Sequence, residues 1–330
     1  MKQNNHLLTP PHVLSGMAPD TTILLGLSGG ADSVTLLHLL TEYCHQNGGT
    51  LYAAHVNHMI RGEEAVRDRE FCLDLAARYD VECFSLDYDV PDFAKQNGMG
   101  LEQAARMIRY DYFRGLMERH SIPLLATAHN ADDALETLIF NLSRGCGLRG
   151  LGSIPPVRSF GGGLLIRPLL SAPKAEILEF CEQNSLAYVT DATNADDSYS
   201  RNFIRHNIIP ALKHLNGGVL KNAARLSESA RIDADFIDGQ VEQYLARPDA
   251  SSLAALRALH PALLCRVLAR LYTEASGGLV AEQTHIASLI TLIERGVGGS
   301  AVSLPGLIRG QIVKKQLEFV PDPRKNFRHL

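Results

Sequence analysis

The chain has 330 residues, 45 % of them hydrophobic, and a formal net charge of −4 at pH 7. Its length predicts two domains, and it holds no stretch near the roughly 20 apolar residues of a membrane span, which argues against a membrane protein. No two of the six cysteines share a C-x-x-C spacing, which excludes the usual zinc, iron–sulfur and dithiol motifs and favours buried thiols in a reducing cytosol.

The first two thirds of the chain alternate short apolar runs with amphipathic helical patterns. The runs cover 22–27, 51–56, 81–86 and 122–127, and the helical patterns cover 32–46, 63–79, 101–119 and 131–143. A fifth strand near 164–169 and a helix over 173–183 complete the series. This succession predicts an α/β fold with a Rossmann-like parallel sheet, whose ligand binds where the loops after Leu27, Val56 and Thr127 converge.

The character of the sequence changes after Asn216-Gly217-Gly218. Helical patterns at 219–246, 251–274 and 281–295 precede β-like runs at 300–304, 307–313 and 316–320. We therefore expect a catalytic domain over residues 1–215 and a smaller, mainly helical domain with terminal strands over 216–330.

The turn after the first strand is typical of a nucleotide phosphate site. It consists of Ser28, Gly29, Gly30, Ala31, Asp32 and Ser33. The two glycines allow positive φ and a close backbone approach to an anion, the following helix directs its positive end there, and Asp32 can hold a metal. The spacing fits neither GxxxxGKS nor GxGxxG. A Ser/Gly turn ahead of a capping aspartate is the alternative.

A second polar block lies at the end of the fourth strand and the start of the next helix. His129, Asp132, Asp133 and Glu136 converge there, and the three carboxylates lie within one turn of the helix. They can complete a Mg²⁺ site with Asp32 or bind an ammonium group. In the alternative interpretation Asn130 caps the helix and the two aspartates complement its dipole.

Two further segments between these blocks carry polar side chains. His55 and Asn57 follow the second strand and are expected on the adenine and ribose side of a nucleotide; a metal at His55 and His58 is the weaker alternative, because no further ligands accompany them. Arg106 and Arg109 lie on an amphipathic helix, either as surface residues or as guanidinium groups that reach ATP phosphates.

Charge is distributed unevenly along the chain. Residues 1–137 contain 10 Lys/Arg and 19 Asp/Glu, residues 138–231 contain 11 and 7, and residues 232–330 contain 11 and 10. The middle third is therefore basic, and its cations can form a face for RNA phosphates or can be ordinary solvated side chains. These cations include Arg144, Arg149, Arg158, Arg167, Arg201, Arg205, Lys213, Lys221, Arg225 and Arg231.

The combined motifs resemble those of the tRNA(Ile)-lysidine synthetases, a family of N-type ATP pyrophosphatases with a PP-loop. The resemblance covers about residues 20–215 and is most specific at 144–151 and 201–205. It rests on SGGADS (28–33), HVNHMIR (55–61), LEQAARMIRYDYF (101–113), TAHNADDALETLIFNLSRGCGLRGLGSIP (127–155), IRPLL (166–170) and DATNADDSYSRNFIRHNIIPAL (191–212). The C-terminal part is similar only loosely, to the short form of the family; a longer form has a further domain for which this chain has no room.

The resemblance implies an ATP-dependent ligase that modifies the wobble cytidine of an isoleucine tRNA with a CAU anticodon. ATP adenylates C2 of the base with release of pyrophosphate, and the ε-amine of free L-lysine then displaces AMP. The resemblance also implies roles for individual residues. Mg²⁺ is expected on Asp32 and Asp133, and substrate lysine on Asp132, Asp133 and Glu136. ATP is expected on the 28–33 turn with His55, Asn57 and Arg109. His129 is a candidate base. The expected catalytic residues are Asp32, Arg109, His129 and Asp133, and the expected tRNA contacts are Arg144, Arg149, Arg201 and Arg205. A cytoplasmic enzyme without membrane attachment is expected, and a homodimer is compatible with the sequence.

Two relatives and one different class of function are the alternatives. A tRNA-thiolating enzyme of the same superfamily uses C-x-x-C pairs, which this chain lacks, and a free-nucleotide amide synthetase leaves the basic segment 144–231 without a role. A noncatalytic ATP-binding regulator would fit only if the carboxylates at 132, 133 and 136 were missing, and they are present.

Overall fold

The computed structural model describes residues 7, 20–60, 62–190 and 200–323. Contacts between residues divide the chain into two units, residues 1–230 and 231–330, and each unit is considered by itself. The division falls within the long helix α11 (Val219–Leu245). The boundary expected at residue 216 stays a prediction.

The first unit is built around a six-stranded sheet with the order β3-β2-β1-β4-β6-β5. β1, β2, β3, β4 and β6 are parallel, and only β5 at the edge is antiparallel. The strands are β1 Thr22–Gly26, β2 Thr50–Asn57, β3 Glu82–Asp87, β4 Leu124–Ala126, β5 Val157–Phe160 and β6 Gly163–Ile166. The predicted parallel α/β fold is confirmed.

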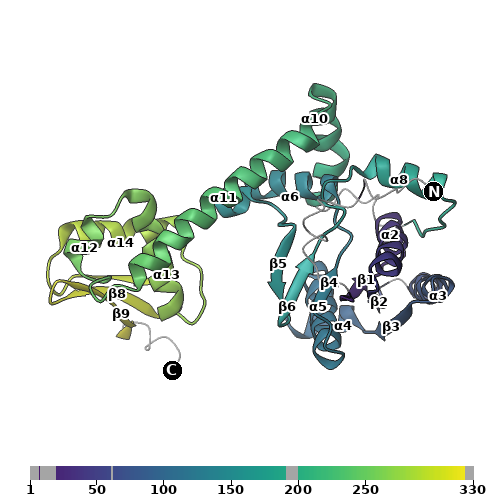
Figure 1. Cartoon of the computed structure of the whole chain (residues 1–330). Coiled ribbons are helices and arrows are strands. Elements are labelled where there is room, and N and C mark those ends of the chain that lie inside the picture. Colours follow the sequence, from purple (N-terminus) through teal and green to yellow (C-terminus); the bar gives the residue numbers. More distant parts are fainter. Residues whose placement is uncertain (1–6, 8–19, 61, 191–199, 324–330) are drawn as a thin grey trace. The chain divides into compact units, whose positions relative to one another are not determined.

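Helices cover both faces of this sheet (Figure 1). α2, α3 and α8 pack on one face and α4 and α5 on the other. The helices of this unit, including those beyond the sheet, are α2 Ala31–Asn47, α3 Glu63–Arg78, α4 Val90–Gln96, α5 Leu101–Arg119, α6 Ala131–Ser143, α7 Leu148–Leu151, α8 Lys174–Gln183, α9 Ser200–Phe203, the π-helical turn η3 Ile204–Ile208 and α10 Ile209–Leu215.

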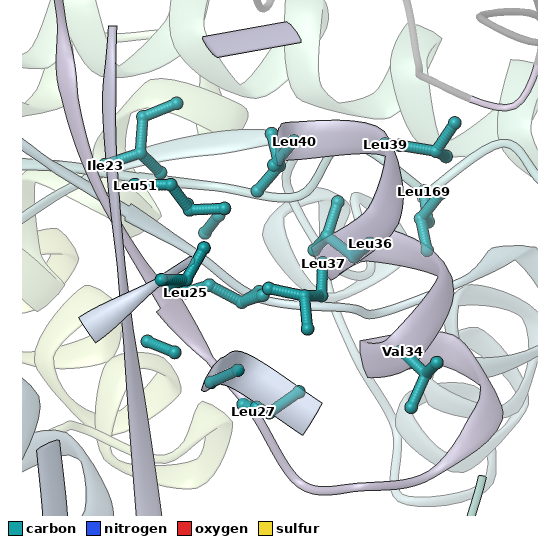
Figure 2. Close-up of a cluster of buried hydrophobic side chains, with 14 of the residues drawn as sticks. Ile23, Leu25, Leu27, Val34, Leu36, Leu37, Leu39, Leu40, Leu51 and Leu169 are labelled. Atoms are coloured by element: carbon teal, nitrogen blue, oxygen red, sulfur yellow. The ribbon is translucent and has the colours of Figure 1, made fainter. Parts of the chain in front are cut away.

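The alternation of side chains along β1 explains the two layers. Ile23 and Leu25 pack against the apolar face of α2, while Leu24 between them packs in the layer of α5. Figure 2 shows the first layer, where Leu36 and Leu37 of α2 lie beside the strand. All five side chains are fully buried, so the position of α2, and of the loop that precedes it, is fixed by this core.

The second unit combines helices with a small antiparallel sheet of order β7-β8-β9. Its core includes Leu256, Val267, Leu268, Tyr272 and Leu289. Its remaining elements are α12 Leu253–Arg257, α13 Pro261–Ala275, α14 Gln283–Arg295, β7 Ala301–Leu304, β8 Ile308–Val313 and β9 Gln316–Pro321. The single helix expected over 251–274 is wrong, because His260 and Pro261 start a new helix there.

Two predictions about individual residues need correction. Pro173 is the N-cap residue of α8 rather than a first-turn residue, with φ −62° and ψ 145°. Of the cysteines, Cys44, Cys72 and Cys181 are buried, whereas Cys83, Cys146 and Cys265 are only partly buried; all six are free thiols. Among the described helices, none is both long and apolar enough to cross a membrane.

Candidate active site

The turn between β1 and α2 brings backbone N–H groups to the carboxyl end of the sheet. Gly29 has φ +84°, and a Cβ there would lie 3.1 Å from the Cys72 sulfur, so this position requires glycine. Gly30 has φ −73°, so the expectation of a positive φ at both glycines is wrong for Gly30; it serves instead as the N-cap residue of α2, without a side chain to cap it. Within the described residues, nothing accepts a hydrogen bond from the N–H groups of Gly30, Ala31 or Asp32. The helix N-terminus is therefore able to bind an anion.

The two serines of the turn fix its shape. The buried Ser33 hydroxyl donates to the Gly30 carbonyl (3.0 Å) and accepts from the Ser28 N–H (3.2 Å). The hydroxyl of Ser28 donates to that of Ser33 (3.1 Å). Ser28 itself lies exposed beside the cavity described below, so it is the better placed of the two to contact a ligand.

Asp32, in the first turn of α2, lies between two donors from distant parts of the chain. Its Oδ2 forms an ion pair with Lys174 Nζ at 2.7 Å, and its Oδ1 accepts from Asn130 Nδ2 at 3.1 Å. Lys174 opens α8 and Asn130 caps α6, so three helices meet at this carboxylate.

The start of α6 is a capping box. The Asp133 N–H donates to Asn130 Oδ1, and the Asn130 N–H donates to Asp133 Oδ2, both at 3.0 Å. The alternative interpretation of this block is thus correct for Asn130, which caps the helix. Asp133 has a second role open to it, because it lines the same cavity as Asp32.

The environment of Asp133 disfavours its charge. Burial raises the pKa of this carboxyl to about 6, and the negative charge of Asp32 adds to the rise, against the Asn130 N–H and Arg205, which lower it. Asp32 and Asp133 are therefore close enough to repel each other, which is the arrangement that a divalent cation relieves.

Basic side chains from beyond the sheet pair with the other carboxylates of α6. Lys213 Nζ contacts Asp132 Oδ1 at 2.5 Å, and Arg205 Nη2 lies 2.7 Å from Glu136 Oε2 and 3.3 Å from Asp133 Oδ1. Arg205 is held there because its neighbours Ile204 and Ile209 pack against Leu135 of α6. The backbone N–H of Lys174 also donates to Asp132 Oδ2 (2.8 Å).

A cavity of about 420 Å³ opens at the carboxyl ends of β1, β2 and β4. The loops after Leu27, Val56 and Thr127 meet around it, as the succession of strands and helices predicts. The predicted site residues that line it are Ser28, Asp32, Ser33, His55, Asn57, Arg109, His129 and Asp133. Gly29, Gly30, Ala31, Asp132 and Glu136 are not part of its wall; they adjoin it through the turn and the first turns of α6.

His55 and Asn57 at the end of β2, and His58 directly after it, line this cavity in different states. The Nδ1–H of His55 donates to the Leu27 carbonyl (2.9 Å). The side chain of Asn57 donates to Asp87 and accepts from the Met59 N–H. The Nδ1 atom of His58 is buried and has no partner among the described residues, and burial lowers the pKa of His58 to about 4. His58, which the sequence suggested only as a weak metal ligand, is thus the imidazole left free to contact a ligand; Arg61 of the same motif lies outside the described residues.

His129 is a neutral imidazole. Burial, followed by the nearby charges of Arg167 and Arg109, lowers its pKa to about 3, and its Nδ1 shares a hydrogen bond with the Thr127 hydroxyl (3.0 Å). It is a weak base as long as those positive charges are not balanced by a bound anion.

The four arginines expected to contact tRNA lie outside the cavity wall. Arg201 forms an ion pair with Glu102 (2.7 Å), and both Arg201 and Arg144 stack over the Phe140 ring at 5.3 Å. Arg205 pairs with Glu136 and Asp133, and Arg149 lies exposed in α7. Residues 191–199 of the neighbouring motif lie outside the described residues.

Sequence reasoning missed the basic partners of the carboxylates. The sequence gives no sign that Lys174 belongs to the site, and it indicates Lys213 only as part of a basic face. They are separated from Asp32 and Asp132 by 142 and 81 positions, so no local spacing indicates the pairs. The motif around IRPLL (166–170), shortly before Lys174, is the nearest signal.

Comparisons with known proteins identify a family. A family model described as the PP-loop domain matches residues 2–212. The chain is 34 % identical over 298 residues to the tRNA(Ile)-lysidine synthase of Geobacillus kaustophilus, which covers 88 % of this chain and 64 % of that protein. It is 37 % identical over 284 residues to the tRNA(Ile)-lysidine synthase of Clostridium perfringens, covering 84 % of this chain and 60 % of the relative. The chain thus spans less than two thirds of the length of these curated relatives.

A solved structure shares the fold. The U34-tRNA thiolase of Methanococcus maripaludis superposes with a TM-score of 0.54 at 23 % identity, over 64 % of this chain and 72 % of that one. At this level of identity the likeness extends to the fold alone.

Proposed function

Because this chain belongs to the PP-loop family, we propose that its cavity binds ATP and that the chain acts as a tRNA(Ile)-lysidine synthetase, an ATP-dependent ligase that forms a C–N bond. The observation that carries this proposal is an ammonium group on a carboxylate at the start of α6. Lys213 places its ammonium group on Asp132, so one of the carboxylates that we assign to substrate lysine already holds the functional group of the proposed amine substrate. Such a site suits an amine nucleophile next to an activated phosphate.

A Mg²⁺ ion fits the donor set at Asp32 and Asp133. Their oxygens are hard ligands that face one cavity. Burial first, and the charge of Asp32 in addition, raise the pKa of Asp133, and a bound cation would offset both effects. Among the described residues, no group of three His, Cys, Asp or Glu side chains is arranged to hold a metal, so we assign the remaining ligands of the ion to ATP phosphates and water. Bound there, Mg²⁺ would supply charge stabilisation for the leaving pyrophosphate.

In the first proposed step, the C2 carbonyl oxygen of the wobble cytidine attacks the α-phosphorus of ATP and pyrophosphate leaves. The N–H groups at the start of α2 adjoin the cavity through the turn, and Arg109 lines it, so both are available to the negative charge that develops on the departing phosphates. His55, Asn57 and His58 occupy the β2 side of the cavity, which we assign to adenine and ribose.

In the second step, the lysine ε-amine attacks C2 and AMP leaves. We assign the lysine ammonium to the carboxylates Asp132, Asp133 and Glu136, where it would compete with Lys213 and Arg205. The ammonium must lose one proton before attack. His129 can accept it only after ATP phosphates balance the arginines that lower its pKa, and a carboxylate of α6 is the other candidate.

Pyrophosphate release under matched conditions tests the proposal. The full chain, Mg²⁺ and ATP are combined with a tRNA(Ile) transcript bearing the CAU anticodon, with and without L-lysine. We expect pyrophosphate to require this tRNA, and lysidine and AMP to appear only when lysine is added. A transcript in which uridine replaces the wobble cytidine is the matched control and should support neither step.

The alternatives predict different requirements. A tRNA-thiolating enzyme would need a sulfur donor and would incorporate no lysine, and a free-nucleotide amide synthetase would release pyrophosphate without tRNA. Either pattern would overturn the proposal. A cytoplasmic location and a homodimer stay predictions.

A further inference from the structure

Four arginines converge on one buried aromatic ring beside the cavity. The guanidinium carbons of Arg106, Arg109 and Arg158 lie 4.9, 5.7 and 5.6 Å from the centre of the Tyr110 ring, and Arg167 shares a side-chain hydrogen bond with Tyr110. We call these four residues the arginine cluster. They come from α5, β5 and the position after β6, so the tertiary fold assembles them.

Among the described residues, no carboxylate forms an ion pair with the arginine cluster, although the charge of Glu102 acts on Arg109 from farther away. None of its four members takes part in an ion pair with Asp or Glu, whereas Arg114 on the same helix pairs with Asp111 at 3.0 Å. Each cation–π contact offsets only part of the repulsion between like charges. A concentration of unpaired guanidinium groups indicates that an anion binds there.

The buried member of the cluster supports this conclusion. Arg167 is 3 % exposed; its Nη1 donates to the Pro155 carbonyl (2.5 Å), but its Nε has no partner among the described residues. Burial lowers the pKa of Arg167 to about 10, and the charges of Arg158 and Arg106 add to this effect against the hydrogen bond with Tyr110. The fold therefore keeps a desolvated guanidinium at Arg167, close to other positive charges.

The position of the cluster distinguishes between anions. Arg109 and Tyr110 line the cavity, whereas Arg106 and Arg158 are exposed and do not. A triphosphate inside the cavity would meet Arg109 but would leave the outer two arginines unpaired. Tyr110 is only 7 % exposed, so its ring is not a platform for a stacking base, and the groups presented to solvent are guanidinium N–H donors.

We propose that the exposed Arg106 and Arg158, with the buried positive charge of Arg167 behind them, bind a backbone phosphate of RNA next to the nucleotide whose base enters the cavity. This inference rests on the proposed function, which requires a base of tRNA to reach the α-phosphate of ATP. The base must leave its stack to do so, while its phosphodiesters stay at the cavity mouth because they are charged and joined to neighbouring nucleotides. Arg109 at the cavity wall then lies between the bound RNA and the nucleotide.

Substitution of the two exposed arginines tests this site without disturbing the core. We compare Arg106→Gln, Arg158→Gln and the double variant with Arg114→Gln, an arginine of the same helix that already has a carboxylate partner. Affinity for the tRNA(Ile) transcript is measured over a salt series, ATP affinity is measured separately, and lysidine formation is followed for the wild type and each variant. Each single variant should bind tRNA about five- to tenfold more weakly, and the log–log salt slope should fall by about 0.7 per lost phosphate contact. ATP affinity, and tRNA affinity of Arg114→Gln, should not change.

The outcomes separate this proposal from the proposed function. Unchanged tRNA affinity and salt slope in the double variant, with wild-type lysidine formation, would overturn the arginine cluster as an RNA site and leave the function intact. A loss of ATP affinity as large as the loss of tRNA affinity would assign the cluster to the nucleotide instead. Absence of lysidine from the wild type would refute the proposed function itself, whereas the salt series would still report whether RNA binds at these arginines.

Discussion

Replacing Asp133 with asparagine should abolish adenylation and at the same time stabilise the first unit at neutral pH. Asp133 is half-buried at the start of α6. Desolvation first, and the nearby charge of Asp32 in addition, raise the pKa of its carboxyl to about 6. Asparagine keeps an oxygen that can accept a hydrogen bond from the Asn130 N–H, so the helix cap is preserved. It removes the negative charge of the carboxylate that we propose as a Mg²⁺ ligand.

The sign and size of the stability effect follow from the pKa. A carboxyl whose folded pKa lies above its unfolded value of 3.8 stabilises the fold below about pH 4 and loses that contribution as pH rises through about 6. The shift of about two pH units corresponds to about 3 kcal/mol at pH 7 as an upper bound, at 1.36 kcal/mol per unit. This upper bound must be reduced, because 29 % of the side chain is exposed and because Arg205 faces an uncharged amide in the variant. We therefore expect the free energy of unfolding of Asp133→Asn to exceed that of the wild type by about 1–2 kcal/mol at pH 7 and by almost nothing at pH 4.

Calorimetry of the full chain measures this difference. The transition of the first unit is recognised as the one that ATP shifts, and its midpoint should rise by about 2–8 °C in Asp133→Asn at pH 7. The buried His58 and His129, whose pKa values are lowered to about 4 and about 3, destabilise both proteins equally on acidification, so their contribution cancels between variant and wild type. Asp92→Asn, an exposed first-turn aspartate of α4, is the matched control and should not stabilise the protein.

Two results would refute this reasoning. A variant less stable than the wild type at pH 7 would mean that the contacts of Asp133 with Asn130 and Arg205 outweigh its burial. Pyrophosphate release at the wild-type rate with tRNA present would remove Asp133 from the metal site, and the same measurement on Asp32→Asn would show whether Asp32 serves alone.

Three further predictions concern lysine, proton transfer and the turn. Glu136→Gln should raise the apparent KM for lysine at least tenfold with pyrophosphate release retained, and loss of pyrophosphate release at saturating ATP and tRNA would place this carboxylate on the metal instead. His129→Ala should slow lysine transfer in single-turnover experiments more than it slows adenylation; equal slowing of both steps would make His129 a residue of the nucleotide site. Gly29→Ala should destabilise the first unit by about 1–3 kcal/mol and weaken ATP binding, because its Cβ would lie 3.1 Å from the Cys72 sulfur and its φ is strained for alanine. Gly98→Ala is the control: its φ is +60° but the space around it is open, so it should show only the smaller cost of the backbone strain.

The elements that position the cavity could be predicted because their signals are local. The apolar run of β1 and the helical spacing of Leu36, Leu37 and Leu40 in α2 identify one strand, one turn and one helix. The parallel succession then places Thr127 and Leu27 at the same edge of the sheet, since strands joined by right-handed crossovers end together. The glycine turn and the Asn130–Asp133 cap are equally local, and both were found from spacing.

Other elements carry weak local signals. β5 is a four-residue edge strand with three exposed side chains, and it owes its pairing with β6 to the turn at Gly161 and Gly162, both at positive φ. The break at Pro261 lies within a helical pattern, so only its first-turn preference indicates it. Arg158 gains its neighbours because β5 returns beside α5, which no periodicity in the sequence encodes.

The carboxylates of the site are balanced by cations that lie far away in the sequence, so the sequence alone does not indicate these cations. Asp32, Asp132, Asp133 and Glu136 place four carboxylates around the start of α6, and Lys174, Lys213 and Arg205 bring three cations to them. Without those cations, the repulsion that Asp32 and Glu136 add to the effect of burial at Asp133 would extend to the whole group. Any metal ion or substrate ammonium that enters must displace one of the cations or relieve the remaining negative charge. Lys174 and Lys213 are the partners best suited to exchange, because each is a flexible ammonium with 38 % of its side chain exposed, whereas Arg205 holds the buried Glu136 through two nitrogens.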